Sequence, residues 1–245
     1  MPSTTSCPYC GKELERAKEN YMGRSIVVGY YGCQCEGAVK ARAEQKAREA
    51  EREAEERRRA KQYEAEAEQR AYEARVRACG IMPRYTDAAH PMAEKLADAI
   101  ESGRNAFVFG RVGTGKTHLV SAAAYVLMRR ERKVLFTSMW RVLDAIKQGF
   151  SEDYDPMPKY QNVEVLILDD LGKESPTDFA LERFFALVDE RSARMLPTIV
   201  TTQYKPSELI ERLAKNGDVD TAIAIVSRLR QDCECIELTG ADRRR

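Results

Sequence analysis

The segment NAFVFGRVGTGKT, residues 105–117, joins a short apolar run to a glycine-rich loop. Residues 105–109 are predicted to form a buried strand, and the amphipathic stretch from Lys116 onward is predicted to form a helix. Glycines in the loop let backbone N–H groups turn inward with no side chain in the way, and the start of a helix adds partial positive charge. Phosphate groups bind to such loops, so strand, loop and helix together match a Walker A motif.

This motif assigns a role to the polar residues at its end. Lys116 is predicted to bridge the β- and γ-phosphates of a nucleotide, and Thr117 to place its hydroxyl on Mg²⁺. The other residues of the predicted nucleotide site lie along the same loop: Gly110, Gly113, Thr114, Gly115 and His118. A glycine-rich turn that matches by chance is the alternative. No Asn-Lys-x-Asp element that would read guanine occurs in the chain, so ATP is favoured over GTP.

A second apolar run ends in two acidic residues. Val-Leu-Ile-Leu occupies residues 165–168, and Asp169 and Asp170 follow directly. Ligands bind at the carboxyl edge of a parallel sheet, so these carboxylates are expected beside the glycine-rich loop. Asp169 is predicted to support Mg²⁺ through its water shell, and Asp170 to orient or deprotonate the attacking water. The alternative is that the two acids only begin a solvated turn.

Beyond Gly80, short apolar runs alternate with amphipathic stretches. The expected strands are residues 105–109, 133–137, 163–168, 198–202 and 233–238, and the expected helices include 116–130, 140–150 and 178–194. Strand and helix in alternation predict an α/β fold, in which a five-stranded parallel sheet lies between helices.

The overall composition excludes few classes of protein. The 245 residues include 40 basic and 39 acidic side chains, a net charge of +1. This balance does not decide on nucleic acid, because such binding depends on a local basic patch. No segment offers the roughly 18 apolar residues of a membrane span, and the N-terminus has no signal-peptide pattern. A cytoplasmic protein with no membrane partner is expected, and its seven cysteines then indicate metal ligands or buried thiols rather than disulfides.

Residues 36–79 are expected to form one long charged helix. From Ala38 to Arg77 the chain contains neither Gly nor Pro and is rich in strong helix formers. Acidic residues precede basic ones by four positions at several places, which stabilises a helix, as in Glu44/Arg48, Glu53/Arg57, Glu55/Arg59, Glu66/Arg70 and Glu73/Arg77. Most apolar positions are alanine, so a coiled coil is not favoured. A solvated spacer and a partner-binding helix are both compatible with this pattern.

Four cysteines near the N-terminus form two pairs. Cys7-Pro-Tyr-Cys10 and Cys33-Gln-Cys35 are separated by 22 residues. Four thiolates suit tetrahedral Zn²⁺ and leave no open position for catalysis. A segment as short as residues 1–35 cannot build a core of its own, so the metal would supply much of its stability. A redox pair, free thiols and an iron–sulfur cluster are the alternatives.

The remaining cysteines and the histidines are assigned structural roles. Cys233 and Cys235 lie at a spacing of two in an expected strand, which favours buried core thiols over metal ligands. Cys79 is expected to be a free thiol at the end of the charged helix. Neither His90 nor His118 has the neighbours that a metal ligand or general base needs.

From Gly80 onward the chain resembles the AAA+ helicase loaders of the DnaC and DnaI type, with the IstB transposition ATPases as close relatives. The resemblance rests on an ordered set of stretches: Gly80-Ile-Met-Pro-Arg-Tyr-Thr-Asp-Ala88, Gly113-Thr-Gly-Lys-Thr-His-Leu119, Leu135-Phe-Thr-Ser138, Leu168-Asp-Asp-Leu-Gly-Lys-Glu174 and Leu196-Pro-Thr-Ile-Val-Thr-Thr202. The Walker motifs alone would indicate only a P-loop ATPase. It is the order of all five that is specific.

This resemblance implies further catalytic residues. Thr202 or Gln203 takes the sensor-1 place, where a polar side chain can bind the γ-phosphate or the attacking water. Arg228, in a stretch similar to the arginine-finger segment, would reach the nucleotide of a neighbouring subunit. Arg230 is the alternative finger. Asp170 stands where many AAA+ proteins have the longer Glu, which puts its part as the base in question.

The implied organisation has three parts: a zinc-binding module in residues 1–35, a charged helical linker in residues 36–79, and an AAA+ ATPase domain in residues 80–245 with no separate C-terminal lid. By resemblance, the protein is a bacterial or phage loader that places a hexameric replicative helicase on single-stranded DNA at replication initiation, within the primosome. Loaders of the Gram-positive type similarly grip the helicase through a zinc module. ATP-bound subunits are expected to form a homo-oligomer.

Two other functions are compatible with the ATPase motifs. One is a transposition helper ATPase of the IstB type, and the other is a DNA-binding scaffold for which ATP is only a switch. DNA binding is implied mainly by the resemblance, because the basic residues between 129 and 133 fit a solvated helix end equally well.

Overall fold

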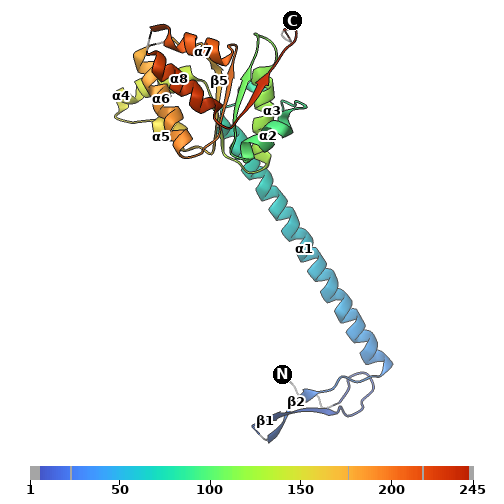
Figure 1. The fold of residues 1–245 in the computed structure, drawn as a ribbon. Coiled ribbons are helices and arrows are strands. Elements are labelled where there is room, and N and C mark those ends of the chain that lie inside the picture. The colour runs from blue at the N-terminus through green and yellow to red at the C-terminus, as the bar shows by residue number, and fades with distance from the viewer. Residues whose placement is uncertain (1–5, 23, 176, 217, 243–245) are drawn as a thin grey trace. The chain divides into compact units, whose positions relative to one another are not determined.

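A computed structural model describes residues 6–22, 24–175, 177–216 and 218–242 of the chain (Figure 1). The chain divides into two compact units, Met1–Glu68 and Gln69–Arg245. The boundary between them falls within one helix, α1, which spans Glu36–Cys79.

The first unit contains an antiparallel hairpin that the sequence analysis did not predict. Strand β1 spans Arg16–Tyr21 and pairs with β2, Arg24–Tyr30. The β-branched run from Ile26 to Val28 favours a strand, but all three side chains are exposed. An isolated two-stranded hairpin is marginally stable in water, so this hairpin needs stabilisation from other parts of the unit.

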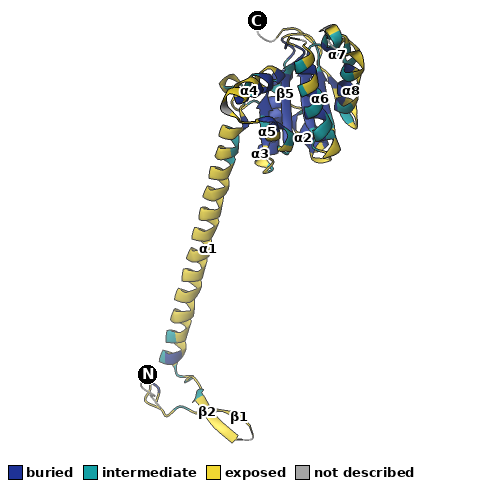
Figure 2. Cartoon of the chain, turned by 90° about the vertical axis from the view of Figure 1, so that its left-hand side faces the viewer, coloured by how far each residue is buried: buried dark blue, intermediate teal, exposed yellow. Residues whose placement is uncertain are grey.

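Helix α1 confirms the predicted long charged helix. Its 44 residues are exposed almost throughout their middle (Figure 2). Among the predicted pairs, Arg59 and Glu55 form an ion pair at 2.6 Å, and Arg77 and Glu73 form one at 3.9 Å. The helix ends at Gly80, whose φ of +86° suits glycine and where a side chain would collide with the carbonyl oxygen of Phe136.

The second unit contains the predicted five-stranded parallel sheet. Its strands are β3 Asn105–Phe109, β4 Val134–Thr137, β5 Val165–Leu171, β6 Thr198–Thr202 and β7 Cys233–Glu237, in the order β4-β5-β6-β3-β7. The helices are α2 Ala93–Glu101, α3 Lys116–Arg129, α4 Met139–Glu152, α5 Met157–Asn162, α6 Asp178–Ala193, α7 Pro206–Leu213 and α8 Val219–Arg230. Short 3₁₀ turns cover Pro83–Tyr85 and Ala214–Asn216.

The sheet lies between two layers of helices, each with its own apolar core. Helices α2 and α3 pack on one face, and α4 to α8 lie over the other (Figure 1). Alternate residues of a strand point to opposite faces: Ala106 and Val108 belong to the first core, and Phe107 belongs to the second. Strands buried on both faces explain the continuous apolar runs seen in the sequence.

Two details differ from the expectations. Strand β5 continues through both aspartates to Leu171, which pairs with Thr202 after a register shift. The prediction that Cys233 and Cys235 are both core thiols is wrong for Cys235, which is exposed, while Cys233 is half-buried. The physical reason is that β7 is an edge strand of the sheet.

Burial changes the chemistry of the inner cysteine thiols. It raises the pKa of Cys233 to about 12 and that of the fully buried Cys79 to about 11, so both are unreactive at neutral pH.

None of the helices in the described part of the chain combines the length and the apolar character that a membrane span requires.

Candidate functional site

The glycine-rich loop leaves β3 at Gly110 and enters α3 at Lys116. Gly115 is the N-cap of the helix, with a φ of +94°. A Cβ on Gly113, whose φ is +82°, would overlap the carboxylate of Asp242. A Cβ on Gly110 would meet the carbonyl oxygen of Leu238. Two of the loop glycines therefore lie where the C-terminal segment approaches closely, with its backbone at Gly110 and with the Asp242 side chain at Gly113.

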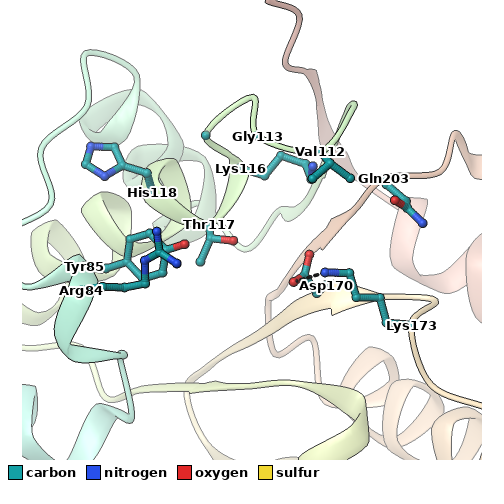
Figure 3. Close-up of a pocket in the computed structure, with 11 residues that line it drawn as sticks. Arg84, Tyr85, Val112, Gly113, Lys116, Thr117, His118, Asp170, Lys173 and Gln203 are labelled. Carbon is teal, nitrogen blue, oxygen red and sulfur yellow. Dashed lines mark hydrogen bonds and ion pairs between the residues drawn. The ribbon is translucent and has the colours of Figure 1, made fainter. Parts of the chain in front are cut away.

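A cavity of about 350 Å³ opens in front of this loop (Figure 3). Most of the predicted nucleotide residues line it. Its walls are formed by Arg84, Tyr85, Val112, Gly113, Gly115, Lys116, Thr117, His118, Asp170, Lys173 and Gln203. Residues far apart in the chain thus meet at the carboxyl edge of the sheet, where ligands of open α/β sheets bind.

The lysine of the loop is largely buried and folds back onto the loop. Lys116 Nζ donates hydrogen bonds to the carbonyl oxygens of Gly110, at 2.8 Å, and Arg111, at 2.9 Å. Thr114 also closes the loop, because its hydroxyl donates to the Arg111 carbonyl oxygen at 2.9 Å. These contacts hold the ammonium beside the cavity that the triphosphate is predicted to occupy.

Asp169 and Thr117 form a buried polar cluster. The Thr117 hydroxyl donates to both Asp169 oxygens, at 3.0 and 3.2 Å, and the Thr201 hydroxyl donates to Oδ1 at 2.6 Å. Burial raises the pKa of Asp169 despite the opposing effect of the Thr201 hydrogen bond. Carboxylate and hydroxyl oxygens fit Mg²⁺, and a buried carboxylate gains stability from a cation. Thr201 was missed in the sequence, where it is one of three threonines in β6.

The second aspartate faces the cavity in an unusual backbone conformation. Asp170 has a φ of +57°, which a non-glycine residue adopts only when its surroundings hold it there. Its N–H donates to the Thr201 hydroxyl at 2.9 Å, and its Oδ2 accepts from Lys173 Nζ at 2.6 Å. Thr201 therefore contacts both aspartates.

The two sensor candidates lie in different surroundings. The Thr202 side chain is fully buried, and its hydroxyl donates to the carbonyl oxygen of Leu171 at 2.7 Å. Gln203 lines the cavity, so it is the sensor candidate that faces the nucleotide site. His118 also lines the cavity, and its Nε2 lies 2.9 Å from the carbonyl oxygen of Ala89.

The arginine-finger candidates are on the last turns of α8. Arg228 Nε donates to Asp189 Oδ1 at 2.6 Å, and its guanidinium lies 4.8 Å from the centroid of the Phe185 ring. Neither Arg228 nor the exposed Arg230 lines the cavity described above. Within one chain, then, the structure does not bring these arginines to the loop.

Besides Val112 of the loop itself, three residues of the cavity wall had no predicted role. Arg84 and Tyr85 come from the 3₁₀ turn Pro83–Tyr85, and the Arg84 guanidinium lies 5.2 Å from the Tyr85 ring centroid. Both residues belong to the stretch from Gly80 to Ala88, which supported the resemblance to the helicase loaders but was given no function. Lys173 follows the two aspartates closely in the chain, a proximity that could have identified it.

In the first unit, the four N-terminal cysteines come together. Their sulfur atoms all lie within 4.8 Å of one another, with Cys7 and Cys35 at 3.7 Å and Cys10 and Cys33 at 3.5 Å. The N–H of Gly11 donates to the Cys7 carbonyl oxygen at 2.9 Å, which closes a turn around the first cysteine pair.

The surroundings shift the pKa values of two of these thiols, Cys7 and Cys10, in opposite directions. The backbone N–H of Tyr9 lowers the pKa of Cys7 to about 6. The N–H of Lys12 acts in the same direction on Cys10, but the Cys33 sulfur and burial oppose it and raise that pKa to about 12. Four sulfurs at this spacing fit tetrahedral Zn²⁺, which binds thiolates and would offset their repulsion.

Comparison with known proteins places the chain in a family. Residues 41–245 match the family described as IstB-like ATP binding protein. The replicative helicase loader DnaI of Bacillus subtilis strain 168 is 22% identical over 269 aligned positions, which cover 100% of this chain and 80% of DnaI. The loader DnaC of Escherichia coli K12 is 25% identical over 128 positions, 50% of this chain and 52% of DnaC. The chain thus aligns with only about half of DnaC.

Solved structures show the same fold. A crystal structure of DnaI superposes with a TM-score of 0.53 and 27% identity, over 66% of this chain and 94% of that one. A crystal structure of the DnaC helicase loader gives 0.52 and 23%, over 64% and 100%. These likenesses confirm the predicted AAA+ core. Because the family match covers most of its length, the chain belongs to the IstB-like ATP binding protein family.

Proposed function

We propose that this protein is an ATP-dependent loader that places a hexameric replicative helicase on single-stranded DNA at replication initiation. One observation carries the proposal. The similarity to the loader DnaI extends over the whole chain, including the cysteine cluster, whereas the IstB-like family match begins only at residue 41. A transposition helper of the IstB type is therefore not favoured.

In this proposal the second unit hydrolyses ATP. Lys116 and the loop N–H groups bind the β- and γ-phosphates. Thr117 and Asp169 would hold Mg²⁺, which neutralises developing charge on the phosphates. Asp170 accepts a proton from the water that attacks the γ-phosphorus, as the bond to the ADP oxygen breaks. Gln203, which reaches the cavity, orients that water or the γ-phosphate, and Thr202 supports the strand end behind it.

We also propose that ATP-bound subunits associate and complete one another's sites. Arg228 would leave Asp189 and reach the γ-phosphate of a neighbour, where a guanidinium stabilises charge in the transition state. Its ion pair with Asp189 has side chains 31% and 48% exposed, and partly exposed pairs of this kind are weak. Breaking the pair is thus a small cost, and Arg230 remains the alternative finger.

The first 35 residues are proposed to be the zinc-binding module that contacts the helicase, and residues 36–79 the linker to an ATPase domain of residues 80–245. Supporting this, the four sulfurs already have the spacing of a metal cluster. A cytoplasmic location belongs to the proposal, because thiolate ligands stay reduced there.

One part of the basic stretch is disfavoured as a DNA contact. Arg130 forms ion pairs with Glu94, Asp98 and Glu101 of α2, and Arg132 pairs with Glu101. The Arg130 hydrogen bond lowers the pKa of Glu101, so this carboxylate stays charged. These ion pairs join α2 to the end of α3, and a phosphate would have to displace carboxylates in order to bind either guanidinium.

The proposal is tested by complex formation between the full chain and its cognate replicative helicase. Size-exclusion chromatography at micromolar concentration with ATP and Mg²⁺ should give co-elution. A Cys7→Ser/Cys10→Ser variant should lose the complex, whereas the control Cys235→Ser should keep it. Separate elution of the wild-type chain and the helicase would contradict the loader function.

A further inference from the structure

The turn after the two aspartates places a lysine against one of them. Lys173 Nζ lies 2.6 Å from Asp170 Oδ2, and the two side chains are 53% and 37% exposed. Figure 3 shows the ion pair at the edge of the nucleotide cavity, across from Thr117 and Lys116. The carboxylate proposed to accept a proton from water is thus already engaged by an ammonium group.

The backbone that carries this pair is firmly held. The Gly172 N–H donates to both carboxylate oxygens of Glu174, at 3.1 Å each. Arg212 donates to the carbonyl oxygens of Gly172, at 2.9 Å, and Glu174, at 3.2 Å. Gly172 has a φ of +91°, and the Tyr204 ring fills the space where a side chain would be. The fold therefore presents Lys173 to Asp170 from a fixed turn.

The pair also separates two cavities. Asp170 and Lys173 line the nucleotide cavity, and both line a second cavity of about 270 Å³ that includes Met82, Trp140 and Arg141. A lysine has a long, flexible side chain. Its ammonium can therefore move away from Asp170 on either side with no change in the backbone of the turn.

The contact matters because a general base must face the proton it accepts. The base has to lie within hydrogen-bond distance of the attacking water. Asp170 Oδ2 accepts a charge-assisted hydrogen bond from Lys173. While the lysine occupies that position, the attacking water cannot donate to the same lone pair. The pair is partly exposed and weak enough to open, so it can act as a reversible restraint.

We propose that Lys173 is a positioning residue that restrains Asp170 and thereby limits the rate of ATP hydrolysis. The chain hydrolyses ATP only while the ammonium is withdrawn into one of the two cavities. Anything that draws it away, such as an anionic group in the second cavity, raises the rate. This inference rests on the proposed ATPase activity and on the part of Asp170 in it.

The test compares steady-state ATP hydrolysis by the full-length wild type and by Lys173→Met. If the pair is closed ~90% of the time, releasing Asp170 raises kcat by about tenfold. The KM for ATP and the affinity for a fluorescent ATP analogue should stay within about twofold, because uniform binding is unaffected. Lys173→Arg should restore the wild-type kcat, and Lys147→Met, which removes an exposed lysine of α4, should leave it unchanged.

A double-mutant cycle shows whether Lys173 acts through Asp170. In an Asp170→Asn background, Lys173→Met should have no further effect on kcat. Acceleration that persists in that background would contradict the inference, as would a Lys173→Met enzyme no faster than wild type. Thermal unfolding checks the fold of each variant, and Lys173→Gln provides a second neutral side chain.

The outcomes separate this inference from the loader function. If the wild type shows no ATP hydrolysis and Lys173→Met hydrolyses ATP, the proposed restraint of Asp170 is supported. If neither protein hydrolyses ATP while the fluorescent analogue still binds, the proposed restraint is rejected. Co-elution with the helicase is a separate readout from ATP hydrolysis, so the loss or retention of that complex bears on the loader function and not on the restraint.

Discussion

At the scale of single residues, the buried Asp169 is the costliest feature of the nucleotide site. Its carboxylate is shielded from solvent, and two threonine hydroxyls provide its hydrogen bonds. Burial raises its pKa, which means that the ionised form destabilises the fold until a cation is present. Sites that perform chemistry commonly retain such strain at the expense of stability.

The first prediction concerns this charge. Without Mg²⁺ at neutral pH, Asp169→Asn should raise the melting temperature by about 2–4 °C, roughly 1 kcal/mol, because no buried charge remains. The sign follows from the raised pKa: the folded state binds a proton more readily, so Asp169 costs stability above that pKa and not below both pKa values. The gain should therefore vanish as the pH falls to the acidic range. An equal gain at acidic and neutral pH, by calorimetry, would exclude this cause.

The second prediction concerns Thr201, which contacts both aspartates. Thr201→Val removes the 2.6 Å hydrogen bond to Asp169 and the acceptor for the Asp170 N–H. Losing an outer partner of a metal ligand weakens metal affinity by about 10- to 100-fold, so the Mg²⁺ concentration for half-maximal ATP hydrolysis should rise by about that factor. Thr137→Val, at another buried strand threonine, is the control. An unchanged Mg²⁺ requirement in Thr201→Val would refute the role.

At the residue scale, the placement of the site residues could be predicted where one motif fixes their positions. The loop residues from Gly110 to Thr117 and the two aspartates lie at one sheet edge because strand ends meet there. Thr201 could not be assigned, since its position depends on the register of β6 against β5. Lys173 is close to the aspartates in the chain, but its contact with Asp170 depends on the turn after β5. A threonine in a predicted strand is explained by its preference for strands, so nothing in the sequence indicates a further role.

At the scale of elements, α6 is tied to its neighbours by one buried guanidinium. Arg191 is 1% exposed. It donates to the Thr198 hydroxyl at 2.9 Å and to the carbonyl oxygens of Tyr160, Val163 and Pro197, at 3.0, 2.8 and 2.7 Å. Burial lowers its pKa to about 9. This side chain fixes the ends of α5, β5 and β6 relative to α6.

The third prediction follows from these contacts. Arg191→Met leaves several buried carbonyl oxygens without donors, which should cost about 3 kcal/mol of unfolding free energy. For a unit of this size that corresponds to about 6–12 °C in melting temperature. The control Arg194→Met, at the C-cap of the same helix and half exposed, should change the melting temperature little. Urea denaturation with equal stability for wild type and Arg191→Met would show that the carbonyls find other partners.

Helices and strands could be predicted where a regular pattern of apolar or charged residues marks them. The strands around the loop and the helix of 44 residues follow from apolar runs and from charge spacing. The hairpin of β1 and β2 was not predicted because its side chains are exposed on both faces. Its sequence therefore shows no alternation of apolar and polar residues. The edge position of β7, which exposes Cys235, follows from strand order and not from local sequence.

At the scale of the whole molecule, two units with different sources of stability share one chain. The second unit has two apolar cores, whereas the first has few buried side chains in its described residues and a cluster of four cysteines. A small unit of this kind relies on metal for its fold.

The fourth prediction is that removal of the metal unfolds the first unit and leaves the second unit folded. A chelator should release a single Zn²⁺ per chain, and the first unit should lose its amide-exchange protection while the second keeps its own. ATP-analogue affinity should stay within about twofold, because every residue of the nucleotide cavity belongs to the second unit. Purified protein without zinc, or protection that survives its removal, would contradict the metal assignment.

The loader function itself is tested most directly by helicase loading on closed circular single-stranded DNA, which an intact ring cannot thread. A labelled oligonucleotide annealed to the circle reports unwinding by the cognate helicase. The account predicts that wild-type protein with ATP greatly raises the rate of strand release, and that Lys116→Ala, which lacks the phosphate-binding ammonium, does not. Strand release no faster than with helicase alone, or equal stimulation by Lys116→Ala, would contradict an ATP-dependent helicase loader.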